Sequence, residues 1–159
     1  MISQLTQWNA VLSSRVPIAY IDIRVFAHAT EDTDKVLSAV HNILPTELVD
    51  KIIFKKTRLT GHYKNPLTLF EMRIKEIDAV KSVFEKLALG LDSLDKELLS
   101  NEIEQHLDRG NLYLRLDKQS AYLNEIKLSS IDPIHLRIHF KKSDQEEIVN
   151  VCKKFGMLL

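Results

Sequence analysis

The clearest pattern in the sequence is an alternation of apolar and polar residues over Ile18–Ala29. The odd-numbered positions from Ala19 to Ala29 are all apolar, and the even-numbered positions after Ile18 are aromatic or ionic. A repeat of two is typical of a strand with one face in a core and the other toward water. The same repeat occurs in 67–75, 111–117 and 134–141. The pattern therefore predicts a sheet whose second face carries rings and charges.

Helical stripes of apolar residues lie between these strands. The predicted helices span 31–44, 76–89, 92–108 and 143–156. The residues expected to begin or end them are Thr30, Pro45, Gly90, Gly110, Ser143, Glu146 and Gly156, with Thr30 as an N-cap and Ser143 and Glu146 as a capping box. Residues 48–59 are predicted to form the second strand, in a hairpin with 67–75, and 125–128 a small strand. Within 48–59, Ile52 and Phe54 are expected to face one way and Ile53 the other.

The resulting order, β-α-β-β-α-α-β-β-α, predicts an α+β fold with helices packed on one face of a mostly antiparallel sheet. A length of 159 residues fits one domain. We expect an N-terminal extension over 1–16, a core over 18–142 and a C-terminal helix over 143–156. An antiparallel sheet can leave its second face wet.

Composition restricts the classes of function. The formal net charge is zero, so any affinity for nucleic acid must come from local clusters of charge. The single Cys152 excludes an intramolecular disulfide and fits a reducing compartment, which predicts the cytoplasm. No uncharged apolar run is long enough to span a membrane. The segment Met1–Ser14 lacks a basic leader, so it is not interpreted as a signal peptide.

The densest basic run is Lys51–Lys64, which holds five Lys or Arg residues and no Asp or Glu. Such a run suits contacts to phosphates, which are salt-dependent because they release counterions. The candidate contacts in it are Lys55, Lys56, Arg58, His62, Tyr63 and Lys64. The alternative is a solvated edge strand that lysines protect from aggregation, and this is the commoner explanation for the run alone.

A second candidate surface is the outward face of the sheet. Its predicted members are Tyr20, Arg24, Phe26, His28, Tyr113, Arg115, His135, Arg137 and His139. Rings and arginines on an exposed sheet are typical of proteins that stack unpaired RNA bases. The alternative is that a helix or a twofold partner covers the rings and that Asp22 pairs with Arg24 or Arg115. The sequence supports both about equally.

The stretch Asn111–Tyr122 begins as a strand and then changes. It offers Tyr113 and Arg115 on the strand, and then Lys118, Gln119 and Tyr122 in a polar turn.

Neither a metal site nor a catalytic site is indicated by the sequence. His135 and His139 are about 13 Å apart on a strand, at ~3.3 Å per residue, which is too far to share an ion. No phosphate-binding loop or nucleophile motif is present, and Cys152 is predicted to be a core thiol. We therefore predict no cofactor, no metal and no catalytic residue.

Three segments carry a resemblance to a known family: His28–Asp32, the run Gly61-His62-Tyr63-Lys64-Asn65-Pro66, and Leu114–Tyr122 with its DKQ-x-A-Y motif. The chain resembles, over about residues 18–142, small archaeal proteins described as predicted RNA-binding proteins or predicted exosome subunits. The family's fold is similar to that of the ribosomal protein that binds 5S ribosomal RNA. Lys64 and Asn124 stand where the resemblance implies glycine.

The resemblance implies a non-enzymatic RNA-binding protein, which favours structured RNA as the partner and RNA processing, degradation or ribosome-related work as the setting. Exosome or ribosome components are the implied protein partners. The alternative class is an interaction module, either a homodimer or an adaptor on an RNA-degrading assembly. A third class, an uncharacterised hydrolase, has no catalytic spacing to support it.

Overall fold

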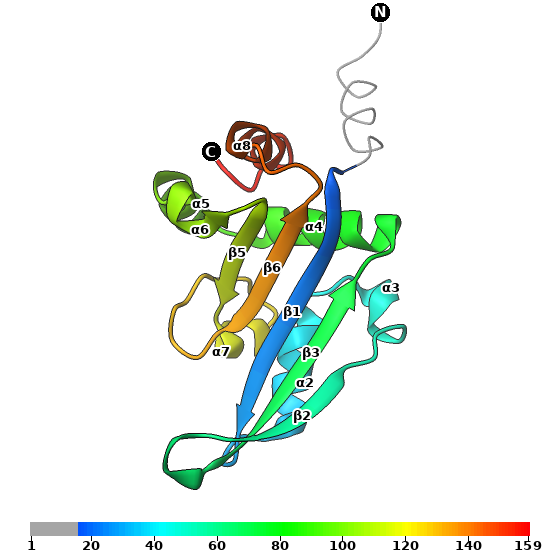
Figure 1. Cartoon of the computed structure of the whole chain (residues 1–159), viewed down its shortest axis with the longest axis vertical. Helices are drawn as coiled ribbons and strands as arrows, with labels where there is room; N and C mark the ends of the chain where they lie inside the picture. Colours follow the sequence, from blue (N-terminus) through cyan, green and yellow to red (C-terminus); the bar gives the residue numbers. More distant parts are fainter. Residues whose placement is uncertain (1–15) are drawn as a thin grey trace, which may run out of the picture.

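The computed structural model describes residues 16–159, and an antiparallel six-stranded sheet forms one of its layers (Figure 1). The strands are β1 (Ile18–His28), β2 (Lys55–Thr60), β3 (Pro66–Ile74), β4 (Leu107–Asp108), β5 (Asn111–Leu116) and β6 (Ile134–Phe140). Their order across the sheet is β2-β3-β1-β6-β5-β4. The long strand β1 therefore pairs with β3 on one side and with β6 on the other. Residues 1–15 of the predicted N-terminal extension lie outside the described residues.

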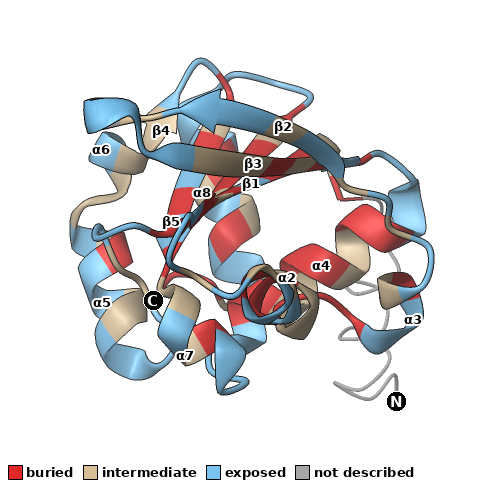
Figure 2. Ribbon diagram, turned by 90° about the horizontal axis from the view of Figure 1, so that it is seen from below, coloured by how far each residue is buried: buried red, intermediate tan, exposed pale blue. Residues whose placement is uncertain are grey.

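The helices are α2 (Thr33–Asn42), α3 (Thr46–Val49), α4 (Ile77–Gly90), α5 (Ser93–Asn101), α6 (Ile103–His106), α7 (Lys118–Tyr122) and α8 (Gln145–Lys154). Figure 2 shows α2, α4, α5 and α7 on one side of the sheet. This confirms the predicted α+β class with helices on one face of an antiparallel sheet. Similarity to the ribosomal protein stays a prediction. In residues 16–159, no helix is both long and apolar enough to cross a membrane.

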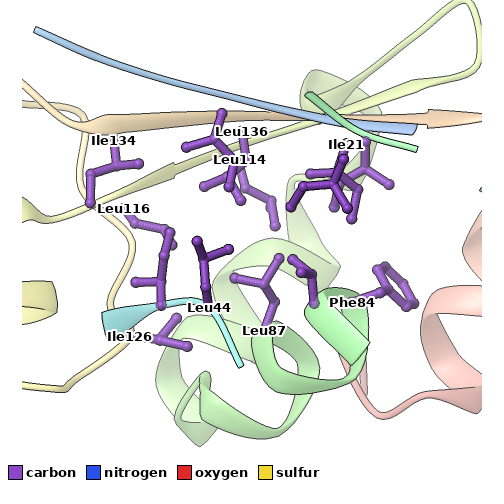
Figure 3. Packing of buried hydrophobic residues seen from close by; sticks show 14 of the residues in the cluster. Ile21, Leu44, Phe84, Leu87, Leu114, Leu116, Ile126, Ile134 and Leu136 are labelled. Atoms are coloured by element: carbon purple, nitrogen blue, oxygen red, sulfur yellow. The ribbon is translucent and has the colours of Figure 1, made fainter. Parts of the chain in front are cut away.

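The core lies between the sheet and these helices. The inward side chains of β5 and β6, such as Leu114 and Leu136, are fully buried, as the alternation predicts. Figure 3 shows them facing Leu87 of α4, with Phe84 of the same helix nearby. Each fully buried leucine or phenylalanine contributes about 1.5–3 kcal/mol of transfer free energy. Cys152 is also buried, and burial raises the pKa of its thiol to about 12, which confirms a core thiol.

The predicted second strand, residues 48–59, is wrong in its first part. The residues Thr46–Val49 form the short helix α3 after Pro45, and the strand β2 begins only at Lys55. The apolar run between them is not a strand, although its side chains point as predicted. Ile52 and Phe54 pack against the core, and Ile53 is 90% exposed.

The predicted helix ends and short strands also need correction. Short polar side chains begin or end helices at positions that the spacing of apolar residues does not mark. The predicted helix 92–108 is broken into α5 and α6, and 107–108 pair with β5 as β4. The N-cap of α2 is Asp32, two residues beyond the predicted Thr30, and that of α8 is Asp144, one residue beyond the predicted Ser143. The predicted small strand 125–128 is reduced to one bridge between Leu128 and Leu116. The order of elements therefore differs from the predicted one.

The two positions where the resemblance implies glycine both have left-handed backbone. Lys64 has φ +60° and Asn124 has φ +64°. Asparagine tolerates this region well, but lysine is strained there by its Cβ. Lys64→Gly is therefore expected to raise the free energy of unfolding by about 0.5 kcal/mol, since relief of strain exceeds the entropy cost of glycine.

Urea unfolding measures this effect, and Asn124→Gly is the matched variant, for which a smaller change is expected. A loss of stability in Lys64→Gly would contradict the strain at this position.

Candidate nucleic-acid interface

The face of the sheet opposite the helices is open and polar. The strands lie in front of α2 and α4 in Figure 1, so this face is toward the reader. Side chains of directly paired residues on neighbouring antiparallel strands share a face. The pairing therefore aligns one cross-strand row on the open face, which runs Lys55–Glu71–Arg24–His135–Arg115. A neighbouring row on the same face runs Arg73–Asp22–Arg137–Tyr113.

These two rows line a shallow depression of about 680 Å³. Its charged side chains are Arg24, Lys55, Arg73, Arg115, Arg137, Asp22 and Glu71, which are five cations and two carboxylates with a net charge of +3. The chain as a whole has a net charge of zero. Such a local excess attracts polyanions even when the global balance does not.

Asp22 neutralises two of the arginines. Its carboxylate accepts hydrogen bonds from Arg73 at 2.7 and 2.9 Å and from Arg137 at 2.6 Å. Burial acts to raise the pKa of Asp22, but the hydrogen bonds from both arginines outweigh it and hold that pKa below its ordinary value. The alternative that paired Asp22 with Arg24 or Arg115 is therefore wrong.

The rings of the open face are also engaged within the chain. Tyr20 stacks on His139 with ring centroids 4.7 Å apart, and the guanidinium of Arg73 lies 3.9 Å from the centre of the Tyr20 ring. Phe26 meets His135 edge-on at 6.5 Å, and Arg24 lies 6.0 Å from the centre of the Phe26 ring. Arginines thus contact Tyr20 and Phe26, two of the rings for which the sequence left free and covered states equally open.

Arg24 and Arg115 differ from the other two arginines of the depression. Both are exposed, and within residues 16–159 neither forms an ion pair. They flank His135 in the cross-strand row. Burial lowers the pKa of His135, and the positive charges of Arg24 and Arg115 lower it further. The neutral ring is therefore favoured, and it lies between two guanidinium groups that form no ion pair within residues 16–159.

The structure divides the residues that the sequence proposed as one surface. Lys55, Tyr113 and Arg115 share the open face. Lys56 and Arg58 alternate with Lys55 on the edge strand β2, so they point to the other side. Tyr63 and Lys64 lie at the tip of the β2–β3 hairpin, in the turn His62–Lys64. Contact of any of these residues with RNA stays a prediction.

The DKQ motif forms a helix instead of the predicted turn. Asp117 is the N-cap of α7, and its carboxylate accepts a hydrogen bond from the backbone N–H of Ser120 at 2.9 Å. The helix packs against α2, where the side-chain amide of Asn42 donates to the backbone carbonyl oxygens of Ala121 and Tyr122. Gln119 and Tyr122 are exposed on α7, in the helix layer and away from the open face (Figure 2).

Lys118 of the same motif is an anchor within the chain. Pairing between β1 and β6 stops at Arg24 and His135, so the carbonyl oxygen of Phe26 lies beyond the last pair. The ammonium of Lys118 donates to this oxygen at 2.6 Å. It also lies 3.1 Å from Glu31 and 2.8 Å from Asp132. The charge that the sequence assigned to RNA is here matched by two carboxylates.

The same cluster contains a set of metal-ligand types. His28, Glu31 and Asp132 bring one ligand atom each to within 4.8 Å of one another. Hydrogen bonds from Lys118 and His28 outweigh the opposing effect of burial and lower the pKa of Asp132. The ammonium of Lys118 already supplies positive charge to both carboxylates, so this arrangement is explained without an ion.

Sequence reasoning placed Arg24 and His135 on the outward face but left them out of the proposed RNA contacts. They gain importance from their neighbours across the strands, since β6 brings His135 between Arg24 and Arg115. Alternation gives the face of a residue, whereas only the register between strands gives its row. The sequence signal that could have added these two residues is the alternation of apolar and polar residues that 18–29, 111–117 and 134–141 share.

Comparison with known proteins identifies the family of this chain. A family model described as RNA binding matches residues 20–140. The RNA-binding protein PAB1135 of Pyrococcus abyssi is 38% identical over 124 residues, which are 76% of this chain and 80% of that protein.

Two solved archaeal structures share the fold. Protein AF2318 from Archaeoglobus fulgidus has a TM-score of 0.73 and 26% identity, over 85% of this chain and 99% of that chain. Mth689 from Methanothermobacter thermautotrophicus has a TM-score of 0.70 and 27% identity, over 89% of this chain and 98% of that chain. The chain belongs to the family described as RNA binding.

Proposed function

We propose that this chain is a non-enzymatic RNA-binding protein that holds its ligand on the open face of the sheet. The observation that carries this proposal is the pair Arg24 and Arg115, exposed over a cationic depression and without an ion pair in the described chain. Arginine presents several donors in a planar fork that fits phosphate oxygens. Lys55 adds a third cation in the same row.

The state of the rings favours structured RNA over unpaired bases. Recognition of single strands uses exposed rings on which bases stack. Here Arg73 and His139 already contact the two sides of Tyr20, and Phe26 is half-buried beneath Arg24. Tyr113 is 37% exposed, which leaves more of its ring open than is the case for Tyr20 or Phe26. The face thus offers mainly charged donors, which suit the sugar–phosphate backbone.

The proposed setting is RNA processing, degradation or ribosome-related work in the cytoplasm, with exosome or ribosome components as protein partners. The resemblance of the Gly61–Pro66 and Leu114–Tyr122 segments to predicted exosome subunits supports this setting. The family description names binding and not a reaction, which supports a non-enzymatic role. The alternative, a homodimer through Tyr20 and Phe26, has less support because charged side chains cover both rings.

The test is direct binding of the whole chain to a labelled RNA hairpin and to an unpaired RNA of equal length, measured at several salt concentrations. Three cations that contact two or three phosphates are expected to give a slope of log affinity against log salt of about −1.5 to −3, at roughly 0.7–0.9 per phosphate. The hairpin is expected to bind more tightly. No binding, or a slope near zero, would rule out the proposal. Size-exclusion mass without RNA tests the homodimer.

Substitution of Asp22 is expected to strengthen RNA binding, whereas most substitutions in a binding site weaken it. Asp22→Asn removes the charge that neutralises Arg73 and Arg137, so the depression gains one unit of positive charge. We expect RNA affinity to rise about threefold and the salt slope to steepen by up to about one unit. Stability should fall by roughly 1 kcal/mol, because hydrogen bonds to a charged acceptor are weakened.

The matched control for this prediction is Glu97→Gln, which removes an exposed carboxylate from α5 in the helix layer. It should leave affinity and slope unchanged. Equal gains from both variants would show that net charge matters and that the open face does not.

A further inference from the structure

Arg24, His135 and Arg115 form a row of three neighbouring basic residues within the open face. Three successive strands, β1, β6 and β5, each place one basic side chain in register. We propose that this row binds one phosphate of the RNA and that His135 takes up a proton as the phosphate binds. This inference rests on the proposed function and adds to it a specific phosphate position and a dependence on pH.

The spacing of the row fits one phosphate. Neighbouring strands are about 4.8 Å apart, so the backbones at Arg24 and Arg115 are separated by about 10 Å with His135 midway. Two long side chains can therefore fold inward over the ring and present their guanidinium groups to one anion. Charge-assisted hydrogen bonds of this kind are the strong ones in phosphate recognition.

The groups around His135 explain why an anion would change its charge. Arg24 on β1 and Arg115 on β5 face it from both sides, and Lys118 on α7 adds a more distant positive charge. Asp132, just before β6, acts in the opposite direction. The ring of Phe26 lies perpendicular to that of His135, with ring centroids 6.5 Å apart. Glu71 on β3 lies beside Arg24 in the same row but forms no ion pair with it. The positive charges and burial together favour the neutral ring, and a phosphate between the guanidinium groups would cancel the effect of those charges.

The sign of the pH dependence follows from linkage. Without RNA the pKa of His135 lies below its ordinary value, because burial and the flanking arginines disfavour the charged ring. With a phosphate beside it the imidazolium is favoured, so the pKa rises. The ligand then binds more tightly as pH falls through the range between the two pKa values, by up to about tenfold for each unit of rise. Above and below that range the affinity is flat.

Lys55 favours a polymer over a free phosphate ion. It lies in the same row, two strands from Arg24, which is about 10 Å away across the sheet. An isolated phosphate can fill the position around His135 but cannot reach Lys55. A chain of phosphates can contact both, so RNA should bind far more tightly than inorganic phosphate.

The experiment measures RNA affinity between pH 5.5 and pH 8 at constant ionic strength, for the wild-type chain, His135→Gln and His41→Gln. His41 is a matched control because it lies on α2 in the helix layer. The wild type and His41→Gln are expected to bind about five- to tenfold more tightly at pH 5.5 than at pH 8. His135→Gln should reduce this ratio to about twofold or less.

A second measurement, NMR titration of the imidazole signals of the wild-type chain, reads the pKa of His135 with and without RNA. It stays decisive if His135→Gln does not fold. A higher pKa with RNA supports the inference, and an unchanged or lower pKa overturns it. RNA binding that weakens on loss of Arg24 and Arg115 but has the same pH dependence in His135→Gln would remove this inference alone. Failure of the wild type to bind RNA would remove the proposed function as well.

Discussion

Replacing Arg24 and Arg115 together by alanine is expected to weaken RNA binding by about 10- to 100-fold. Each arginine would lose a charge-assisted contact to phosphate, and such contacts contribute on the order of 1 kcal/mol each at an exposed site. The slope of log affinity against log salt should fall by about 1 unit, at roughly 0.7–0.9 for each phosphate that loses its cations. Both quantities come from one series of binding curves at increasing salt.

The fold should survive this double substitution. Both side chains are exposed and form no ion pair within residues 16–159, so the free energy of unfolding should change by less than about 0.5 kcal/mol. The matched control is the double variant Lys153→Ala and Lys154→Ala, which removes the same charge from the end of α8. Equal losses in the two double variants, or none in either, would show that the open face does not bind RNA.

The second large effect is expected at Lys118, and it is an effect on stability. Lys118→Met should lower the free energy of unfolding by roughly 2–3 kcal/mol. The side chain is 13% exposed, and its ammonium bonds to the Phe26 carbonyl oxygen, Glu31 and Asp132. Methionine fills similar volume but leaves these acceptors without their donor, which costs about 1–3 kcal/mol for a buried group and less where water can reach it.

Urea unfolding measures this loss, and Gln119→Ala, at the exposed neighbouring position, should stay within about 0.5 kcal/mol. The double variant Lys118→Met and Asp132→Asn should lose less than the sum of the two single variants, because the two residues interact. RNA affinity of folded Lys118→Met decides whether this lysine also contacts RNA. A stability loss below about 0.5 kcal/mol would contradict the anchoring role.

The sequence was most informative where apolar residues alternate without interruption. β1, β3, β5 and β6 lie within one or two residues of their predicted ranges, and their inward residues are the buried ones. Prediction failed at 46–54, where Ile52, Ile53 and Phe54 follow one another and carry no period. It also failed at 118–122, although Asp117 and Ser120 contain the spacing of an N-cap.

The candidate site was harder to predict than the strands. Alternation placed Arg24 and Arg115 on one face, but the strand between them, β6, comes later in the sequence than both. Which cations Asp22 would neutralise depended on the register of β1 with β3 and β6, and the register selected Arg73 and Arg137. A single sequence does not contain that register, so it could not separate the neutralised arginines from the others.

The central place of β1 has a consequence for the opening of the sheet. The segment Ile21–Arg24 is paired on both sides, whereas β2 is an edge strand with one neighbour. Amide hydrogens in this segment should therefore exchange with deuterium last, and those of β2 among the first. A ligand that reaches from Arg115 across Arg24 to Lys55 would contact the edge strand β2 and the central strand β1 together. RNA should therefore slow exchange in β2 more than in β1.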